Sequence, residues 1–82
     1  MKLSLAQMKP GCSGVICSVG GGGALRRRLL DMGLTPKTTV MVRKVAPMGD
    51  PIEIHLRSYE LTLRNDEAAK IEVELVSAED AV

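Results

Sequence analysis

Short alternating segments separated by glycine and proline constrain the fold of this chain more than any other feature of its sequence. Apolar residues fall at every second position of Ile52–Leu56 and Ile71–Leu75, which is the period of a strand with one buried face. Pro10-Gly11 and residues 47–51 carry typical turn residues. Short strands with such corners favour a small closed barrel, because closure leaves no unpaired strand edge. We therefore predict a mainly β fold of about five short strands, at residues 14–19, 38–46, 52–57, 61–63 and 71–75.

A single clear helix interrupts these strands. After four consecutive glycines, Gly20–Gly23, apolar residues recur with helical spacing and predict a helix over Ala24–Met32. Gly33 suits the left-handed position that follows a helix, and Leu34 would then contact Leu29 in the last turn. The glycines are followed by neither the lysine nor the serine or threonine of a phosphate-binding loop, so we interpret them as a flexible connector.

Three smaller features complete the expected fold. The alternation of the second strand slips near Arg43-Lys44, which predicts a β-bulge. Helical turns are expected after Ser4, where Gln7 completes a capping box, and after Asn65 as an N-cap. The residues expected in the core follow the two periodicities: they are Leu25, Leu29, Val40, Val42, Ile52, Ile54, Leu56, Leu61, Leu63, Ile71 and Val73, with Met8 and Met32 as filler.

The chain has room for one small domain. From its 82 residues we expect a single domain at residues 1–76, followed by a disordered acidic tail at residues 77–82. A cavity able to enclose a substrate would consume most of the core of so small a domain. No motif joins the one histidine to a serine or cysteine nucleophile. We therefore predict no catalytic residues and no enzymatic activity.

The scarcity of aromatic side chains argues against two common classes of binding module. Tyr59 is the one aromatic residue, since the chain has no phenylalanine and no tryptophan. Modules that stack nucleic-acid bases and grooves that bind proline-rich peptides both need several aromatic side chains. Tyr59 itself is expected at a corner of the barrel, with its ring packed and its hydroxyl group in water.

Charge is divided unevenly along the chain. Eight basic residues and one acidic residue precede residue 45, whereas three basic and nine acidic residues follow, for a net charge of +1. This division indicates a dipolar surface. We recognise no secretory signal, and no apolar run approaches the ~20 residues needed to cross a bilayer. The two cysteines are expected as reduced thiols, and the sequence therefore predicts a cytoplasmic location.

Metal ligands are sparse in the sequence. Cys12, Cys17 and His55 are one ligand short of a structural zinc site. We expect Cys17 to be buried in a strand and His55 to lie on an outer face of the barrel. The sequence therefore predicts neither a bound metal nor an organic cofactor.

Several segments of the chain, taken in order, resemble one protein family. They are Leu25–Pro36, Val45–Ile52, Arg57–Arg64, Glu67-Ala68 and Ile71–Val73. Together they resemble the ferrous-iron transport protein A family. The resemblance implies an SH3-like barrel in the cytosol, with no catalytic activity. It also implies a role in assisting ferrous-iron transport protein B, a membrane transporter with a cytoplasmic GTPase domain. Lys37 and Ser58 stand where members of the family often carry glycine.

The expected function is that of a small adaptor that docks on the cytoplasmic side of this transporter. The predicted helix has arginines at residues 26–28, near its positive end, and Asp31 near its negative end, so these charges oppose the helix dipole. Local rules broken without a structural gain tend to mark function. The residues predicted to contact the transporter are Arg26, Arg27 and Leu30, joined by Met48 from the turn. The alternative is a solvated basic face with Leu30 folded inward.

Two other functions stay open from the residues alone. A small barrel bound to RNA or to the ribosome would contact phosphates through Lys9, Arg26, Arg27, Arg28, Lys37, Arg43 and Lys44. The near-neutral net charge and the scarcity of aromatic residues argue against it, and we expect no nucleic-acid partner. A metal chaperone would need a stoichiometric metal site. Membrane association is expected only through the transporter, and weak self-association of the chain is left open.

Overall fold

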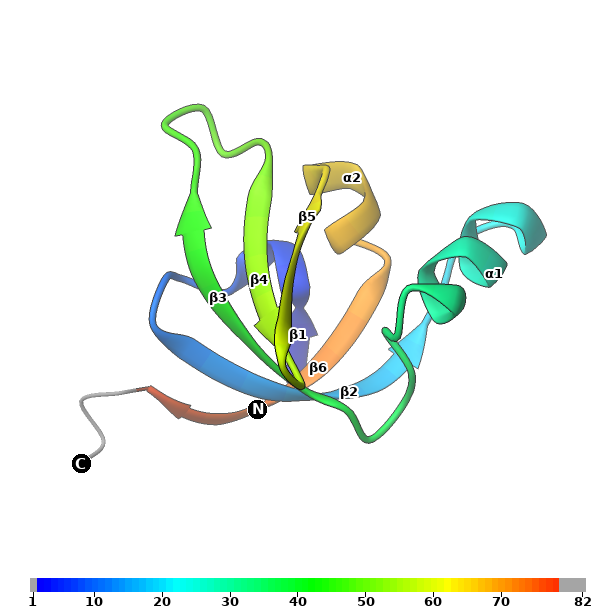
Figure 1. Ribbon diagram of the computed structural model, residues 1–82, viewed down its shortest axis with the longest axis horizontal. Coiled ribbons are helices and arrows are strands. Elements are labelled where there is room, and N and C mark those ends of the chain that lie inside the picture. The colour runs from blue at the N-terminus through cyan, green and yellow to red at the C-terminus, as the bar shows by residue number, and fades with distance from the viewer. Residues whose placement is uncertain (1, 79–82) are drawn as a thin grey trace.

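Six antiparallel strands curl into a small barrel in the computed structural model of this chain, which describes residues 2–78 (Figure 1). The strand order is β1-β6-β2-β3-β4-β5, and among the described residues no pairing joins β1 to β5. The closed barrel expected from the sequence is therefore not complete, and these two strands remain its edges. The strands are β1 (Lys2–Ser4), β2 (Cys12–Val19), β3 (Thr39–Val45), β4 (Ile52–Leu56), β5 (Tyr59–Leu63) and β6 (Ile71–Ala78). A 3-10 turn, η1 (Leu5–Gln7), follows β1, helix α1 (Gly23–Asp31) connects β2 to β3, and the short helix α2 (Asn65–Ala68) connects β5 to β6.

All five strands expected from the sequence are present, and β1 is an additional strand that the sequence did not predict. β1 has three residues and pairs with β6, where Leu3 lies opposite Val73. Three residues are too few to show an alternation of apolar and polar side chains, and β1 is a strand only because it pairs with β6. β6 runs to Ala78, so residues 77 and 78, expected in the tail, belong to this strand instead. The remaining tail residues, 79–82, lie outside the described part of the chain.

The bulge expected near Arg43-Lys44 is confirmed. The register between β3 and β4 shifts between Val42, which lies opposite Ile54, and Lys44, which lies opposite Glu53. The extra residue breaks the alternation of faces, and both Arg43 and Lys44 are exposed. The bulge therefore places two neighbouring cations on the outside of the barrel.

Nine of the eleven residues expected in the core from their periodicity are buried. The buried apolar residues are Leu5, Met8, Ile16, Val19, Leu29, Leu34, Val40, Val42, Ile52, Ile54, Leu56, Leu63, Ala68, Ile71 and Val73. Leu25 and Leu61 were expected there but are only half-buried, as is Met32. Leu25 lies in the first turn of α1, which stands beside the barrel (Figure 1), and Leu61 lies in β5 at an edge of the sheet.

The end of α1 follows the geometry that the sequence predicts. Gly33 has a φ of +98°, the left-handed conformation that glycine adopts without strain. The Leu34 amide donates to the Leu29 carbonyl at 3.2 Å, and the Gly33 amide donates to the Leu30 carbonyl at 3.0 Å. These two bonds define a Schellman motif, and Leu34 and Leu29 are both fully buried in the core.

The two helical turns differ in how well the sequence predicts their beginnings. At η1 the Ser4 amide donates to Gln7 Oε1 at 2.8 Å, as a capping box requires. At α2 the N-cap residue is Arg64 and not the expected Asn65. The Asn65 amide donates to Asp50 Oδ1, and Asn65 Nδ2 donates to the Gly49 carbonyl, both at 2.9 Å. Asn65 therefore attaches α2 to the β3–β4 loop instead of capping the helix with its side chain.

No helix within residues 2–78 is long and apolar enough to cross a membrane.

Candidate partner-binding surfaces

Two of the three arginines on α1 have contacts within the chain. Arg26 Nε donates to the Val19 carbonyl at 3.0 Å, which ties the first turn of α1 to the end of β2. Arg28 pairs with Glu67 of α2. Among the described residues, no ion pair joins Arg27 or Arg28 to Asp31. Arg26 and Arg28 oppose the helix dipole, and each has a contact with another element that explains its place. No local pattern in the sequence reveals these contacts.

Glu67 is the buried member of the pair with Arg28. Its side chain is 11% exposed, against 57% for the side chain of Arg28. Glu67 Oε1 also accepts a hydrogen bond from the Arg64 amide at 3.0 Å, at the beginning of α2. One carboxylate therefore satisfies the N-terminal end of α2 and links α2 to α1.

Arg27 and Leu30 form the part of α1 that remains available to a partner. Arg27 is exposed, and within the described residues its side chain has no hydrogen bond or ion pair. Leu30 is half-buried and packs against the core. From the sequence, Leu30 was expected either to face a partner or to fold inward. The structure lies between these two alternatives, because part of the side chain packs against the core and part faces solvent beside the arginines.

Met48 lies far from these residues. It occupies the β3–β4 loop, which stands on the opposite side of the barrel from α1 (Figure 1). The residue is 91% exposed. The four residues predicted to contact a partner therefore form two separate surfaces, one on α1 and one at the β3–β4 loop.

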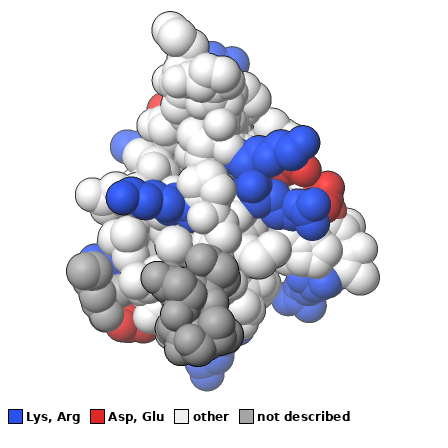
Figure 2. Space-filling view, turned by 90° about the vertical axis from the view of Figure 1, so that its left-hand side faces the viewer, with Lys and Arg blue, Asp and Glu red and all other residues white. Residues whose placement is uncertain are grey.

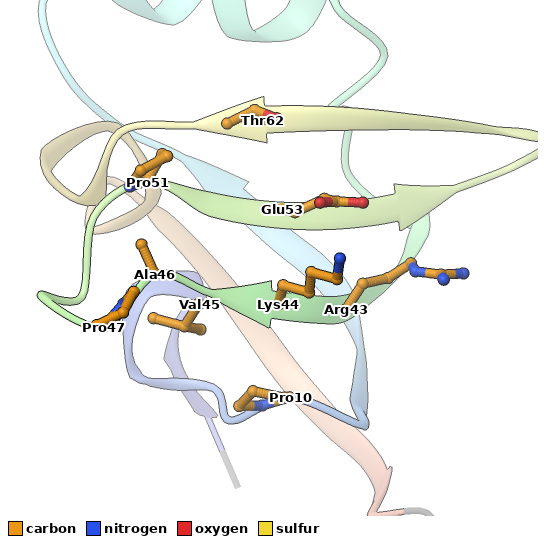
Figure 3. A pocket seen from close by; sticks show the side chains of 9 residues that line it. All are labelled: Pro10, Arg43, Lys44, Val45, Ala46, Pro47, Pro51, Glu53 and Thr62. Carbon is orange, nitrogen blue, oxygen red and sulfur yellow. The ribbon is translucent and has the colours of Figure 1, made fainter.

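A groove opens beside Met48, on the outer face of β3, β4 and β5 (Figure 3). Its volume is about 510 Å³, and its lining comprises Pro10, Arg43, Lys44, Val45, Ala46, Pro47, Pro51, Glu53 and Thr62. Three of the chain's four prolines line it. From the sequence these prolines were interpreted only as turn residues. No local sequence pattern indicates that residue 10 and the segment 47–51 lie side by side in the fold.

Cations flank the surface on this side of the molecule. Figure 2 shows lysine and arginine side chains on both sides of an uncharged strip that runs down from the β3–β4 loop. Arg43 is paired with Glu60, at 3.2 Å between Nη1 and Oε2. Lys44 is exposed and takes part in no ion pair among the described residues. Glu53, opposite Lys44 in the register, is half-buried.

The potential metal ligands are dispersed. No group of three or more His, Cys, Asp or Glu residues within the described part of the chain is arranged to hold a metal ion. His55 lies on the outer face as expected, with Nδ1 3.9 Å from Glu60 Oε2. Cys12 and Cys17 are free thiols, and both are half-buried, whereas Cys17 was expected to be buried.

Tyr59 departs from the expectation for its hydroxyl group. The residue lies at a corner and is 43% exposed, but its hydroxyl donates a hydrogen bond to the Met32 carbonyl at the end of α1. Because Met32 is the C-cap residue, its carbonyl has no partner within the helix. The one aromatic side chain of the sequence therefore closes the helix end and joins it to β5.

The fold and these surfaces define a class, the small SH3-like barrel domains. Within this class, a family model described as the FeoA domain matches residues 3–75. The chain belongs to the FeoA family. The family resemblance and the mainly β, SH3-like fold predicted from the sequence are thereby confirmed.

Known proteins of this family are similar over most of the chain. A Fe(2+) transport protein A/Fe(2+) transporter FeoB fusion protein from Porphyromonas gingivalis is 40% identical over 76 residues, which are 93% of this chain and 9% of the fusion protein. The crystal structure of an iron uptake regulatory protein, FeoA, has a TM-score of 0.85 at 32% identity and covers 93% of this chain and 100% of its own.

A third relative carries a metal. FeoA from Stenotrophomonas maltophilia, solved in complex with zinc and described as a prokaryotic SH3 domain protein, has a TM-score of 0.77 at 25% identity. The match covers 88% of this chain and 89% of that one.

Proposed function

We propose that the chain assists ferrous-iron uptake as a non-catalytic adaptor that docks on the cytoplasmic side of a FeoB-type transporter. The observation that carries this proposal is the Porphyromonas gingivalis fusion, in which a 40% identical domain is covalently joined to such a transporter. Fusion keeps a weakly binding domain at high effective concentration beside its target. A separate chain of the same family would reach the same target by binding.

The docking surface of this proposal is α1, through Arg27 and Leu30, with Arg26 beside them. Arg27 is exposed, and its guanidinium is free to pair with a carboxylate of a partner, a bidentate geometry that arginine favours. The half-exposed Leu30 adds apolar area next to it. Arg26 already uses Nε to bond the Val19 carbonyl, so it would contribute through its remaining guanidinium nitrogens.

Binding to the purified full-length transporter tests the proposal, together with ferrous-iron uptake by cells that lack the chain. We expect wild-type chain to bind and to restore uptake. Arg27→Glu replaces an attraction by a repulsion and should weaken binding roughly tenfold, or about 1.4 kcal/mol.

The matched control is Arg27→Lys, which keeps the charge and should retain most of the affinity. Both variants alter an exposed side chain, so their unfolding midpoints should match that of the wild type. If wild-type chain does not bind the transporter, or if its deletion leaves uptake unchanged, the proposal is wrong. If it binds but Arg27→Glu binds equally well, α1 is not the docking surface.

A further inference from the structure

The groove beside Met48 has the properties of a preformed docking site. Pro10, Pro47 and Pro51 supply rigid apolar walls, because proline has a fixed φ and few side-chain rotamers to lose on binding. Val45 and Ala46 complete the apolar part of the lining. A groove whose walls are already ordered binds with a smaller entropic cost than a flexible surface does.

Hydrogen bonds hold the loop that forms one wall of this groove. The Ala46 amide donates to the Pro51 carbonyl at 3.1 Å, and the Gly49 amide donates to the Ala46 carbonyl at 2.7 Å. Asn65 of α2 adds its two bonds to Asp50 and to the Gly49 carbonyl, both at 2.9 Å. The loop is therefore fixed both within itself and to a neighbouring helix, and it presents Met48 to solvent from a stable base.

The lining also indicates what the groove can bind. It contains no aromatic residue, so it lacks the stacked rings on which proline-rich peptides dock. Aliphatic side chains fit a wall of proline, valine and alanine, and the exposed Met48 can adapt to them.

Among the charged lining residues, Arg43 is paired with Glu60. Lys44 has no ion-pair partner among the described residues and lies opposite Glu53 in the register. The exposed Lys9, next to Pro10, adds a further cation at the edge. Lys44 and Lys9 therefore outnumber the one carboxylate of the lining, Glu53, by a single positive charge.

We propose that this groove and Met48 form a second docking site, which takes an extended segment of the transporter bearing aliphatic and acidic side chains. The aliphatic side chains would lie against the prolines, and the carboxylates would face Lys44 and Lys9. This inference rests on the proposed adaptor function and extends it, because the groove is lined by residues of the β3–β4 loop, and this loop stands on the other side of the barrel from α1 (Figure 1). An adaptor with two such surfaces contacts two separated parts of its partner.

Two substitutions test the groove without touching α1. Ala46→Trp fills the groove with a large side chain, and Lys44→Glu reverses the charge at its edge. Each should weaken binding of the chain to the purified full-length transporter roughly tenfold at low salt. Raising the salt concentration should weaken the binding of the wild-type chain to the transporter more than it weakens the binding of Lys44→Glu. Salt screens an attraction between Lys44 and a carboxylate, and the variant lacks this attraction.

The matched control is Lys70→Glu, which reverses an exposed charge outside the groove lining and should bind like the wild type. Thermal unfolding of all variants shows whether they remain folded. Since Lys44 is exposed, its variant keeps the test valid even if Ala46→Trp disturbs the loop. Overlapping peptides from the transporter's cytoplasmic segments, added to isotopically labelled chain, should shift the amide resonances of Ala46, Gly49 and Thr62.

The outcomes separate this inference from the function on which it rests. If wild-type chain binds the transporter and both groove variants bind equally well, the second docking site is wrong and the adaptor function stands. If wild-type chain does not bind, both are wrong. If the groove variants abolish only self-association of the chain, the occupant is a second copy and the proposed transporter segment is wrong.

Discussion

The hydroxyl group of Tyr59 donates a hydrogen bond to the backbone carbonyl of Met32. This contact joins the beginning of β5 to the residue that caps α1, across 27 positions of sequence. It also explains why glycine follows Met32. A Cβ atom at Gly33 would lie 2.5 Å from the Tyr59 hydroxyl oxygen, and the φ of Gly33 is +98°, so both the space and the backbone conformation favour glycine.

The contact between Tyr59 and Gly33 predicts a measurable coupling. Gly33→Ala should cost about 2–3 kcal/mol, because an alanine in the left-handed region costs roughly 1–2 kcal/mol and its Cβ displaces the hydroxyl. Tyr59→Phe alone should cost about 0.5–1.5 kcal/mol for the lost hydrogen bond. When Tyr59→Phe is already present, Gly33→Ala should cost only about 1–2 kcal/mol, since the next nearest ring atom is Cζ at 3.8 Å.

Denaturant unfolding of the four proteins in this double-mutant cycle measures the coupling. Additive losses would show that Tyr59 and Gly33 do not compete for the same space.

Lys37 occupies a position that glycine suits better. The Thr38 amide donates to the Thr35 carbonyl at 3.1 Å, Pro36 is the second residue of this turn, and Lys37, the third, has a φ of +74°. These are the features of a type II turn, whose third residue is usually glycine. The family resemblance implied glycine at this position, and glycine adopts such a conformation without strain. Lys37→Gly should therefore stabilise the chain by about 0.5–1 kcal/mol and raise its melting temperature by several degrees.

The control for this prediction is Lys37→Ala. It removes the same side chain but retains the backbone strain, so its melting temperature should stay near or below that of the wild type. Equal stabilisation by glycine and alanine would mean that the lysine side chain, and not the backbone conformation, is unfavourable.

Truncating Glu67 should destabilise the fold more than truncating its ion-pair partner, Arg28. Glu67→Ala removes a buried carboxylate together with its bond to the Arg64 amide and should cost about 1–3 kcal/mol. Arg28 is more than half exposed, and solvent screens such charges, so Arg28→Ala should cost less than about 1 kcal/mol. The free energy of unfolding of each variant gives the comparison. Equal losses would contradict the capping role that we assign to Glu67.

Ile54 is fully buried at the centre of β4. Ile54→Ala should cost about 2–5 kcal/mol through lost apolar burial and the cavity that remains, a large part of the stability of a small domain. Thr39→Ala, at an exposed position of the neighbouring strand, should change stability by less than about 0.5 kcal/mol. Circular dichroism during thermal unfolding measures both, and an unchanged melting temperature for Ile54→Ala would contradict its place in the core.

The candidate surfaces were predicted less completely than the fold. The sequence indicated Arg27 and Met48 as exposed and available, and the structure leaves both exposed. It could not show that Arg26 bonds the Val19 carbonyl or that Arg28 meets Glu67, because these partners come from other elements. The groove was missed for the same reason, since Pro10 and Pro51 lie 41 positions apart in the sequence and only the bent sheet brings them to one face.

The sequence by itself determined the features that depend on neighbouring residues. Alternation placed β4 and β6, the slip at Arg43-Lys44 placed the bulge, and Gly33 with Leu34 placed the end of α1, because each is a local conformational preference with a fixed period or spacing. The tertiary structure alone decided β1, the exposure of Leu25 and Leu61, and the bond from Tyr59 to Met32. Each of these depends on which distant segment lies beside the residue, and the curvature of the sheet decides that through contacts that no local pattern encodes.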